Sequence, residues 1–183
     1  RSEFPIPILG IILPGAMAAV KSGKHIGVVS TEATAKSNAY KQAVLEIDAT
    51  AEVRQVGCQD FVPLIEGDRI HDPYTLAVAK RYLDPLVEAG IDTLVYGCTH
   101  YPHLAPVFKQ ILPSSIKLID PARHLTAAAA QELKILRLRR PAVSVESGST
   151  EFYVSGDPEQ FARVSQQWLG HRPQVSKVEV STL

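Results

Sequence analysis

The chain has 183 residues, enough to bury one large hydrophobic core or two smaller ones. Its 19 basic and 19 acidic residues cancel, which argues against a nucleic-acid surface and a polybasic membrane anchor and favours a small-molecule partner. Only two cysteines are present, which excludes the dense disulfide framework of a secreted scaffold and predicts a cytoplasmic location.

The first apolar stretch, residues 4–20, is interrupted by three prolines and two glycines, unlike a signal or membrane-spanning segment. Within it, Ile6–Leu13 is rich in β-prone residues and ends at Pro14 and Gly15, which predicts a strand followed by a turn. Ala16–Lys21 is predicted to form a short helix. Because Arg1 is not an initiator methionine, we expect the chain to begin within a longer protein.

Strands and helices are then predicted to alternate, because short apolar runs are separated by segments with helical spacing. This alternation indicates an α/β fold with a doubly wound, mainly parallel sheet. Residues 58–67 and 139–149 lack a clear repeat and are predicted to be irregular. The predicted strands are His25–Val29, Ala51–Val56, Asp92–Tyr96, Ile116–Ile119, Phe152–Ser155 and Val175–Val180. The predicted helices are residues 31–47, with Thr31 as the N-cap, and residues 72–90, 103–112, 121–138 and 158–169.

One segment combines several reactive side chains, Gly97-Cys98-Thr99-His100-Tyr101-Pro102-His103. It follows a predicted strand, and Pro102 is favoured in the first turn of the helix predicted next. Because open α/β sheets bind their ligands beyond the carboxyl ends of the strands, Cys98 is predicted to lie where such sheets carry their chemistry. Taken alone, Cys98 could also be a small hydrophobic core residue, as we expect for Cys58.

The same residue types also occur in other kinds of functional site. A zinc site built from Cys98, His100 and His103 with Cys58 or His71 is conceivable, but the spacing is not a strong zinc signature. No arginine follows Cys98 through Gln110 to close the phosphate loop of a cysteine phosphatase. There is also no glycine-rich dinucleotide or phosphate loop, and nothing singles out Lys21, Lys24 or Lys36 for pyridoxal phosphate. We therefore expect neither a metal nor a cofactor.

The block Gly97–Pro102 resembles the second-cysteine signature of the glutamate racemases, cofactor-independent members of the aspartate/glutamate racemase superfamily. Other segments resemble blocks of the same family in the same order, and the resemblance covers roughly residues 5–130. Blocks around an N-terminal cysteine of the family do not occur, so the chain resembles a C-terminal fragment. The other matching segments are Gly10–Ala16, Ile26–Thr34, Phe61–Glu66 and Leu118–Ala122.

The resemblance implies a reaction and a set of residues. Glutamate would be racemised by two acid–base groups on opposite faces of the α-carbon, a role that thiols can fill. Cys98 would be one of these groups and act on the L-enantiomer, with His100 as its proton partner and Glu66 assisting His100. Thr99 and His100 match substrate-contacting positions, and Thr34 matches a threonine near the substrate carboxylate. The product would supply D-glutamate for peptidoglycan.

The resemblance also implies two similar, pseudo-symmetric α/β domains. Residues 1–113 would form the complete second domain and residues 114–183 the returning part of the first, so this chain alone is expected to be inactive. A homodimer is compatible with the resemblance. Two alternatives stay open: another racemase of the superfamily, such as an aspartate racemase, and a non-catalytic ligand-binding module.

Overall fold

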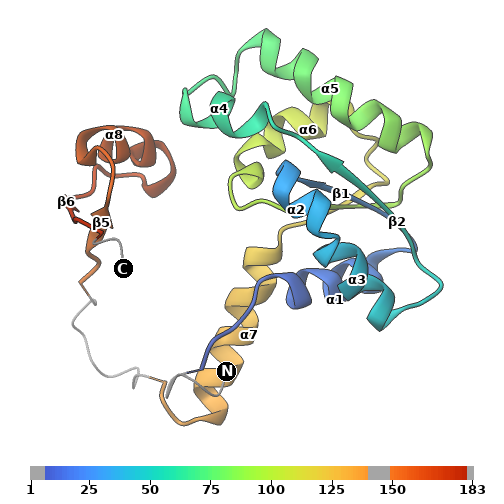
Figure 1. The fold of residues 1–183 in the computed structure, drawn as a ribbon, viewed down its shortest axis with the longest axis horizontal. Helices are drawn as coiled ribbons and strands as arrows, with labels where there is room; N and C mark the ends of the chain where they lie inside the picture. The colour runs from blue at the N-terminus through green and yellow to red at the C-terminus, as the bar shows by residue number, and fades with distance from the viewer. Residues whose placement is uncertain (1–6, 140–148, 181–183) are drawn as a thin grey trace. The chain divides into compact units, whose positions relative to one another are not determined.

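A computed structural model describes residues 7–139 and 149–180 of the chain (Figure 1). The chain divides into two compact units, residues 1–139 and 140–183. The first unit contains a four-stranded parallel sheet with the order β2-β1-β3-β4. Its strands are β1 (His25–Ser30), β2 (Glu52–Gly57), β3 (Thr93–Tyr96) and β4 (Lys117–Ile119).

The sheet changes its direction of winding between β1 and β3. The chain first adds β2 on one side of β1 and then crosses to add β3 on the other side. The loops after β1 and β3 therefore leave the sheet edge in different directions, which is where open α/β sheets form their binding crevice. The predicted doubly wound, parallel sheet is confirmed.

Helices cover both faces of this sheet. α1, α3 and α7 lie on one face, and α4, α5 and α6 lie on the other (Figure 1). The α4 side carries the larger core, which includes the aromatic side chains of Phe61, Tyr101 and Phe108. The helices are α1 (Ile12–Ser22), α2 (Glu32–Ser37), α3 (Ala39–Ile47), α4 (Phe61–Glu66), α5 (Pro73–Glu88), the 3-10 turn η1 (Tyr101–Leu104), α6 (Ala105–Ile111) and α7 (Pro121–Ile135).

The strand predicted over Ile6–Leu13 is wrong for the described residues of that segment. Residues 7–11 are not in a strand, and α1 begins at Ile12. Pro14 is compatible with this helix because the first turn contains N–H groups that need no helical partner. Gly15 is required there, since an added Cβ would lie 2.9 Å from the Pro121 ring at the start of α7. The packing of α1 on α7 thus overrides the local β preference.

Two other predictions also need correction. The single helix predicted through Ile47 is broken at Asn38, whose φ of 54° separates α2 from α3. The Asn38 side chain accepts a hydrogen bond from Gln55 Nε2 on β2 at 2.9 Å, which holds the break against the sheet. The segment 58–67, predicted to be irregular, contains α4, because Pro63 falls in the first turn and does not interrupt the helix.

The second unit is a short βαβ motif. β5 (Phe152–Val154) pairs in parallel with β6 (Val175–Lys177), and α8 (Pro158–Leu169) connects them. Asp157 caps α8, and Gly170 ends it with a φ of 74°. β6 ends at Lys177, so it is shorter than the strand predicted over Val175–Val180. Residues 140–148 of the predicted loop lie outside the described residues. β4 and α7 belong to the first unit of this chain, where β4 pairs with β3. The predicted domains, residues 1–113 and 114–183, are those of a longer protein and stay a prediction.

Candidate active site

Cys98 lies in the turn that follows β3, at the carboxyl edge of the sheet. The preceding Gly97 donates its N–H to the Val29 carbonyl oxygen at 2.7 Å, so the turn begins close against β1. A Cβ atom on Gly97 would lie 2.8 Å from the Cβ of Ser30 and 3.0 Å from the Val29 oxygen. Glycine is the residue that allows this approach, and it places the next residue, Cys98, at the junction of β1 and β3. Cys98 is a free, partly exposed thiol.

Three of the predicted site residues lie in one chain of contacts. Cys98 Sγ lies 3.9 Å from His100 Nδ1, and His100 Nε2 lies 2.8 Å from Glu66 Oε1. The thiol and the carboxylate thus approach opposite nitrogens of one imidazole ring. This arrangement lets the ring pass a proton or hold one, with Glu66 fixing its orientation. The side chains of His100 and Glu66 are 34% and 48% exposed, so the contact faces solvent.

The two threonines of the predicted site lie apart from this chain of contacts. Thr34 is in the first turn of α2, beyond the carboxyl end of β1, and its hydroxyl pairs with that of Thr31 at 3.0 Å. Thr31 also caps α2, accepting a hydrogen bond from the Thr34 N–H. Thr99 is exposed in the turn between Cys98 and His100. The hydrogen-bond partner of the Cys98 thiol is His100, and neither threonine takes this place.

Burial separates the two cysteines chemically. Cys58 is fully buried, and burial raises the pKa of its thiol to about 12, so it stays protonated at neutral pH. Tyr40 lies on the other face of the sheet and is also buried, and burial together with the charge of Cys98 raises its pKa to about 12. Its electrostatic coupling to Cys98 was not predicted.

The zinc alternative finds no support in the arrangement of the side chains. Among the residues that the structure describes, no three His, Cys, Asp or Glu side chains gather into a possible metal site. Within the same residues, no helix is long and apolar enough to span a bilayer.

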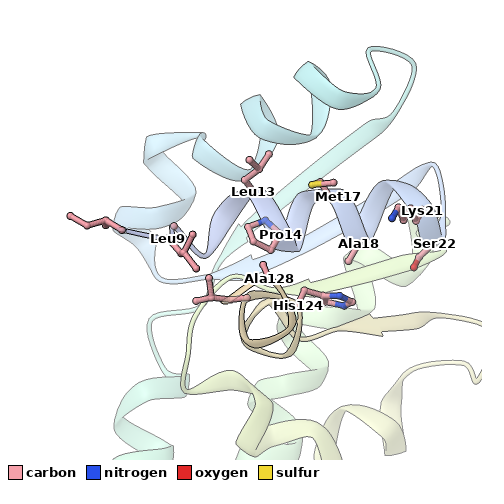
Figure 2. A pocket seen from close by; sticks show the side chains of 12 residues that line it. Leu9, Leu13, Pro14, Met17, Ala18, Lys21, Ser22, His124 and Ala128 are labelled. Carbon is pink, nitrogen blue, oxygen red and sulfur yellow. The ribbon is translucent and has the colours of Figure 1, made fainter. Parts of the chain in front are cut away.

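A separate cavity of about 870 Å³ lies between α1 and α7 (Figure 2). Its walls are mainly apolar and include Leu13, Met17 and Ala128, with His124 and Lys21 toward one end. None of the predicted site residues lines it. The cavity therefore supplies neither the thiol nor the carboxylate that acid–base chemistry at Cys98 requires.

A thiol, an imidazole and a carboxylate lie in contact at the carboxyl edge of the parallel sheet. This arrangement is typical of α/β proteins that carry out acid–base chemistry. Residues 1–129 match the profile of the Asp/Glu/hydantoin racemase family. The chain belongs to this family. It is 60% identical over 178 residues to the glutamate racemase of Gloeothece citriformis, an alignment that includes 97% of this chain and 63% of that protein. The Synechocystis glutamate racemase is 58% identical over 183 residues, covering all of this chain and 64% of that protein.

Solved structures give the same relationship. The glutamate racemase isoform RacE1 from Bacillus anthracis has a TM-score of 0.86 and 30% identity, covering 98% of this chain and 67% of that one. A glutamate racemase from Francisella tularensis, solved with D-glutamate, has a TM-score of 0.84 and 28% identity, covering 97% and 65%. The chain therefore spans less than two thirds of the length of the curated relatives named above.

Proposed function

We propose that this chain is part of a glutamate racemase that interconverts L- and D-glutamate without a cofactor. The observation that carries the proposal is the contact series from Cys98 through His100 to Glu66 at the carboxyl edge of the sheet. High identity to curated glutamate racemases supports the choice of glutamate over aspartate. A non-catalytic binding module would not need a partly exposed thiol in contact with an imidazole.

In the proposed reaction the α C–H bond of L-glutamate breaks, and its proton moves to the Cys98 thiolate. The electron pair remains on the α-carbon and is delocalised into the substrate carboxylate. A second acid on the opposite face then delivers a proton, which yields D-glutamate. His100 exchanges a proton with Cys98, and Glu66 orients His100 and balances its charge when it is protonated.

Substrate binding is proposed to use groups around the same edge. Thr99 and His100 would contact glutamate directly, and the exposed position of Thr99 agrees with this role. Thr34 would approach the substrate carboxylate from the end of β1, across the switch point from Cys98. The Thr34 hydroxyl can accept the hydrogen bond from Thr31 and still donate its own proton to the substrate carboxylate.

The second acid is proposed to come from a part of the longer protein. Because the chain spans 63% of the Gloeothece relative, the opposite face of the substrate would be formed by sequence outside it. In that protein, residues 1–113 would form one α/β domain and residues 114–183 would complete the other. We place the reaction in the cytoplasm, where thiols stay reduced, and propose that its product supplies D-glutamate for peptidoglycan.

The test is proton exchange in the full-length protein. In D₂O, wild-type protein should exchange the α-proton of both glutamate enantiomers, followed by NMR. Cys98→Ser should slow exchange from L-glutamate by ~10³-fold, because a serine hydroxyl loses its proton far less readily than a thiol and so provides little base. The unfolding temperature should stay nearly unchanged. Equal activity of this variant and the wild type would overturn the proposal.

The 183-residue chain gives a second test. Without an acid on the other face of the substrate, we expect it not to racemise glutamate. Circular dichroism of L-glutamate solutions incubated with the purified chain measures this directly. A rapid loss of the optical signal would show that both acid–base groups are already present.

A further inference from the structure

Tyr101, next to the proposed catalytic histidine, connects the two segments that form the site. Its side chain is fully buried, and its hydroxyl donates a hydrogen bond to the Cys58 carbonyl oxygen at 2.9 Å. Cys58 follows β2, whereas Tyr101 follows β3, so this bond joins loops from strands that are not neighbours in the sheet. β1 lies between those two strands.

The same residue contacts the start of the helix that carries Glu66. The Tyr101 ring packs edge-on against Phe61, the first residue of α4, with ring centres 5.1 Å apart and an interplanar angle of 88°. The Phe61 N–H also approaches the Cys58 carbonyl oxygen, at 3.3 Å. One carbonyl therefore receives both the Tyr101 hydroxyl and the first N–H of α4, which fixes the beginning of that helix.

On its other side, Tyr101 closes the turn that contains Cys98 and His100. The Tyr101 N–H donates to the Cys98 carbonyl oxygen at 3.2 Å. A closed path thus runs from Cys98 through His100 to Glu66, down α4 to Phe61, and back through Tyr101. The Glu66–His100 contact is exposed, and exposed pairs contribute little to holding a structure together. The buried residues of the path, Tyr101 and Phe61, must therefore hold Glu66 and His100 in position.

We propose that Tyr101 is a positioning residue, whose hydroxyl holds α4 against the Cys98 turn and thereby keeps Glu66 in contact with His100. This inference rests on the proposed function for its effect on turnover, but its effect on His100 can be measured without any activity. Burial raises the pKa of the Tyr101 phenol well above its ordinary value, so the hydroxyl remains a donor at every pH used for the tests.

The first experiment uses Tyr101→Phe in the full-length protein, which keeps the ring and removes only the hydroxyl. We expect kcat for L-glutamate to fall about tenfold with little change in KM, the scale of one lost hydrogen bond. Tyr96→Phe is the matched control. Tyr96 is also buried beside Phe108, and among the described residues its hydroxyl has no hydrogen-bond partner, so its loss should leave kcat unchanged.

The second experiment asks whether Tyr101 acts through Glu66. If it does, the double variant Tyr101→Phe/Glu66→Gln should be no slower than Glu66→Gln alone, since the contact that Tyr101 maintains is already lost. Independent losses that multiply in the double variant would overturn the proposal. They would show that the hydroxyl affects turnover by a route that does not involve Glu66.

A spectroscopic measurement separates this inference from the proposed reaction. The ring nitrogen signals of His100, assigned by their loss in His100→Asn, should move in Tyr101→Phe toward their positions in Glu66→Gln, while Tyr96→Phe leaves them in place. Unmoved signals in Tyr101→Phe would refute the positioning role even in an active enzyme. A wild-type protein that shows no proton exchange, with these signals shifted as expected, would refute only the proposed function. Should Tyr101→Phe not fold, Phe61→Leu, which removes the ring contact between Tyr101 and the start of α4, should move the His100 signals toward their Glu66→Gln positions, and unmoved signals would count against the proposal.

Discussion

Glu66 Oε1 and His100 Nε2 lie 2.8 Å apart, although 34 residues separate them and they belong to segments that follow different strands. Glu66 is the last residue of α4, and His100 lies in the turn after β3. The contact is exposed, so its value is in orienting the imidazole that also faces Cys98, and not in stabilising the fold.

Replacing Glu66 by glutamine in the full-length protein should therefore lower turnover more than stability. We expect kcat to fall about tenfold or more, with the unfolding temperature changed by no more than about a degree. Steady-state racemisation and thermal unfolding by circular dichroism measure the two effects. Glu46→Gln, which changes an exposed carboxylate on α3, is the control and should alter neither. Equal turnover of both variants would contradict the role given to Glu66.

The two cysteines should differ in their reaction with iodoacetamide. Cys98 is partly exposed, while Cys58 is buried with its pKa raised to about 12, so only Cys98 should be alkylated in the folded chain between pH 7 and 9. Peptide mass spectrometry after a timed reaction identifies the modified residue. The Cys98→Ser chain should take up no label until denaturant is added. Labelling of Cys58 under native conditions would show that the α4 side of the core opens readily.

Gly97→Ala should destabilise the first unit. The new methyl group would lie 2.8 Å from Ser30 Cβ and 3.0 Å from the Val29 oxygen, and overpacking of this kind costs about 1–3 kcal/mol. Gly10→Ala is the control, because nothing lies within 4 Å of a Cβ there. Circular dichroism is the appropriate probe, since the single tryptophan, Trp168, is in the second unit. Equal melting of the two variants would mean that β1 and β3 can separate at little cost.

Asp92 should make the stability of the chain depend on pH in the acid range, below about pH 3.8. Its carboxylate accepts N–H groups from Lys24 at 2.9 Å and His25 at 3.1 Å. Burial raises the pKa of Asp92, but these hydrogen bonds outweigh burial and hold the pKa below its ordinary value of 3.8. A carboxyl whose pKa is lowered by folding stabilises the folded state above pH 3.8, and this stabilisation is lost as the pH falls through its folded-state pKa.

Asp92→Ala should accordingly melt a few degrees below wild type at pH 7, and the difference should shrink as the pH falls below about 3.8. Thermal unfolding across a pH series measures the difference. Asp84→Ala, which removes an exposed carboxylate 3.3 Å from Lys80, should show little difference at either end of the series. A gap between Asp92→Ala and wild type that stayed constant with pH would assign the effect to packing instead of charge.

The parallel sheet could be predicted from the sequence because its strands are short apolar runs separated by helices. The site was partly predictable for the same reason: Cys98 follows a buried strand directly, and the resemblance supplied His100 and Glu66. The resemblance also paired Glu66 with His100, but the 2.8 Å distance between them comes only from the structure, because it depends on the position of α4. That helix was not predicted because residues 58–67 lack a clear repeat, and Pro63 lies in its first turn, where a proline leaves a helix intact.

Tertiary contacts explain the other differences from the sequence-based predictions. Ile12 and Leu13 have β-prone neighbours, yet they begin a helix because α1 packs on α7 through Gly15. Thr31 correctly marked a helix start, but no local pattern indicated the left-handed residue Asn38 that ends this helix seven residues later. The hydrogen bond of the Tyr101 hydroxyl could not be predicted from the sequence either, because its acceptor is a backbone carbonyl oxygen 43 positions away.

The small sheet of the second unit should make its backbone amides exchange faster than those of the first unit. Within residues 149–180 this sheet consists of β5 and β6, a pair of three-residue strands, and two-stranded sheets are at best marginally stable in water. Deuterium uptake by the backbone amides of Tyr153 and Ser176 should therefore be orders of magnitude faster than at Val28 and Val95, which occupy the centre of the larger sheet. The amides of this chain should thus fall into two kinetic populations that follow the boundary between the units.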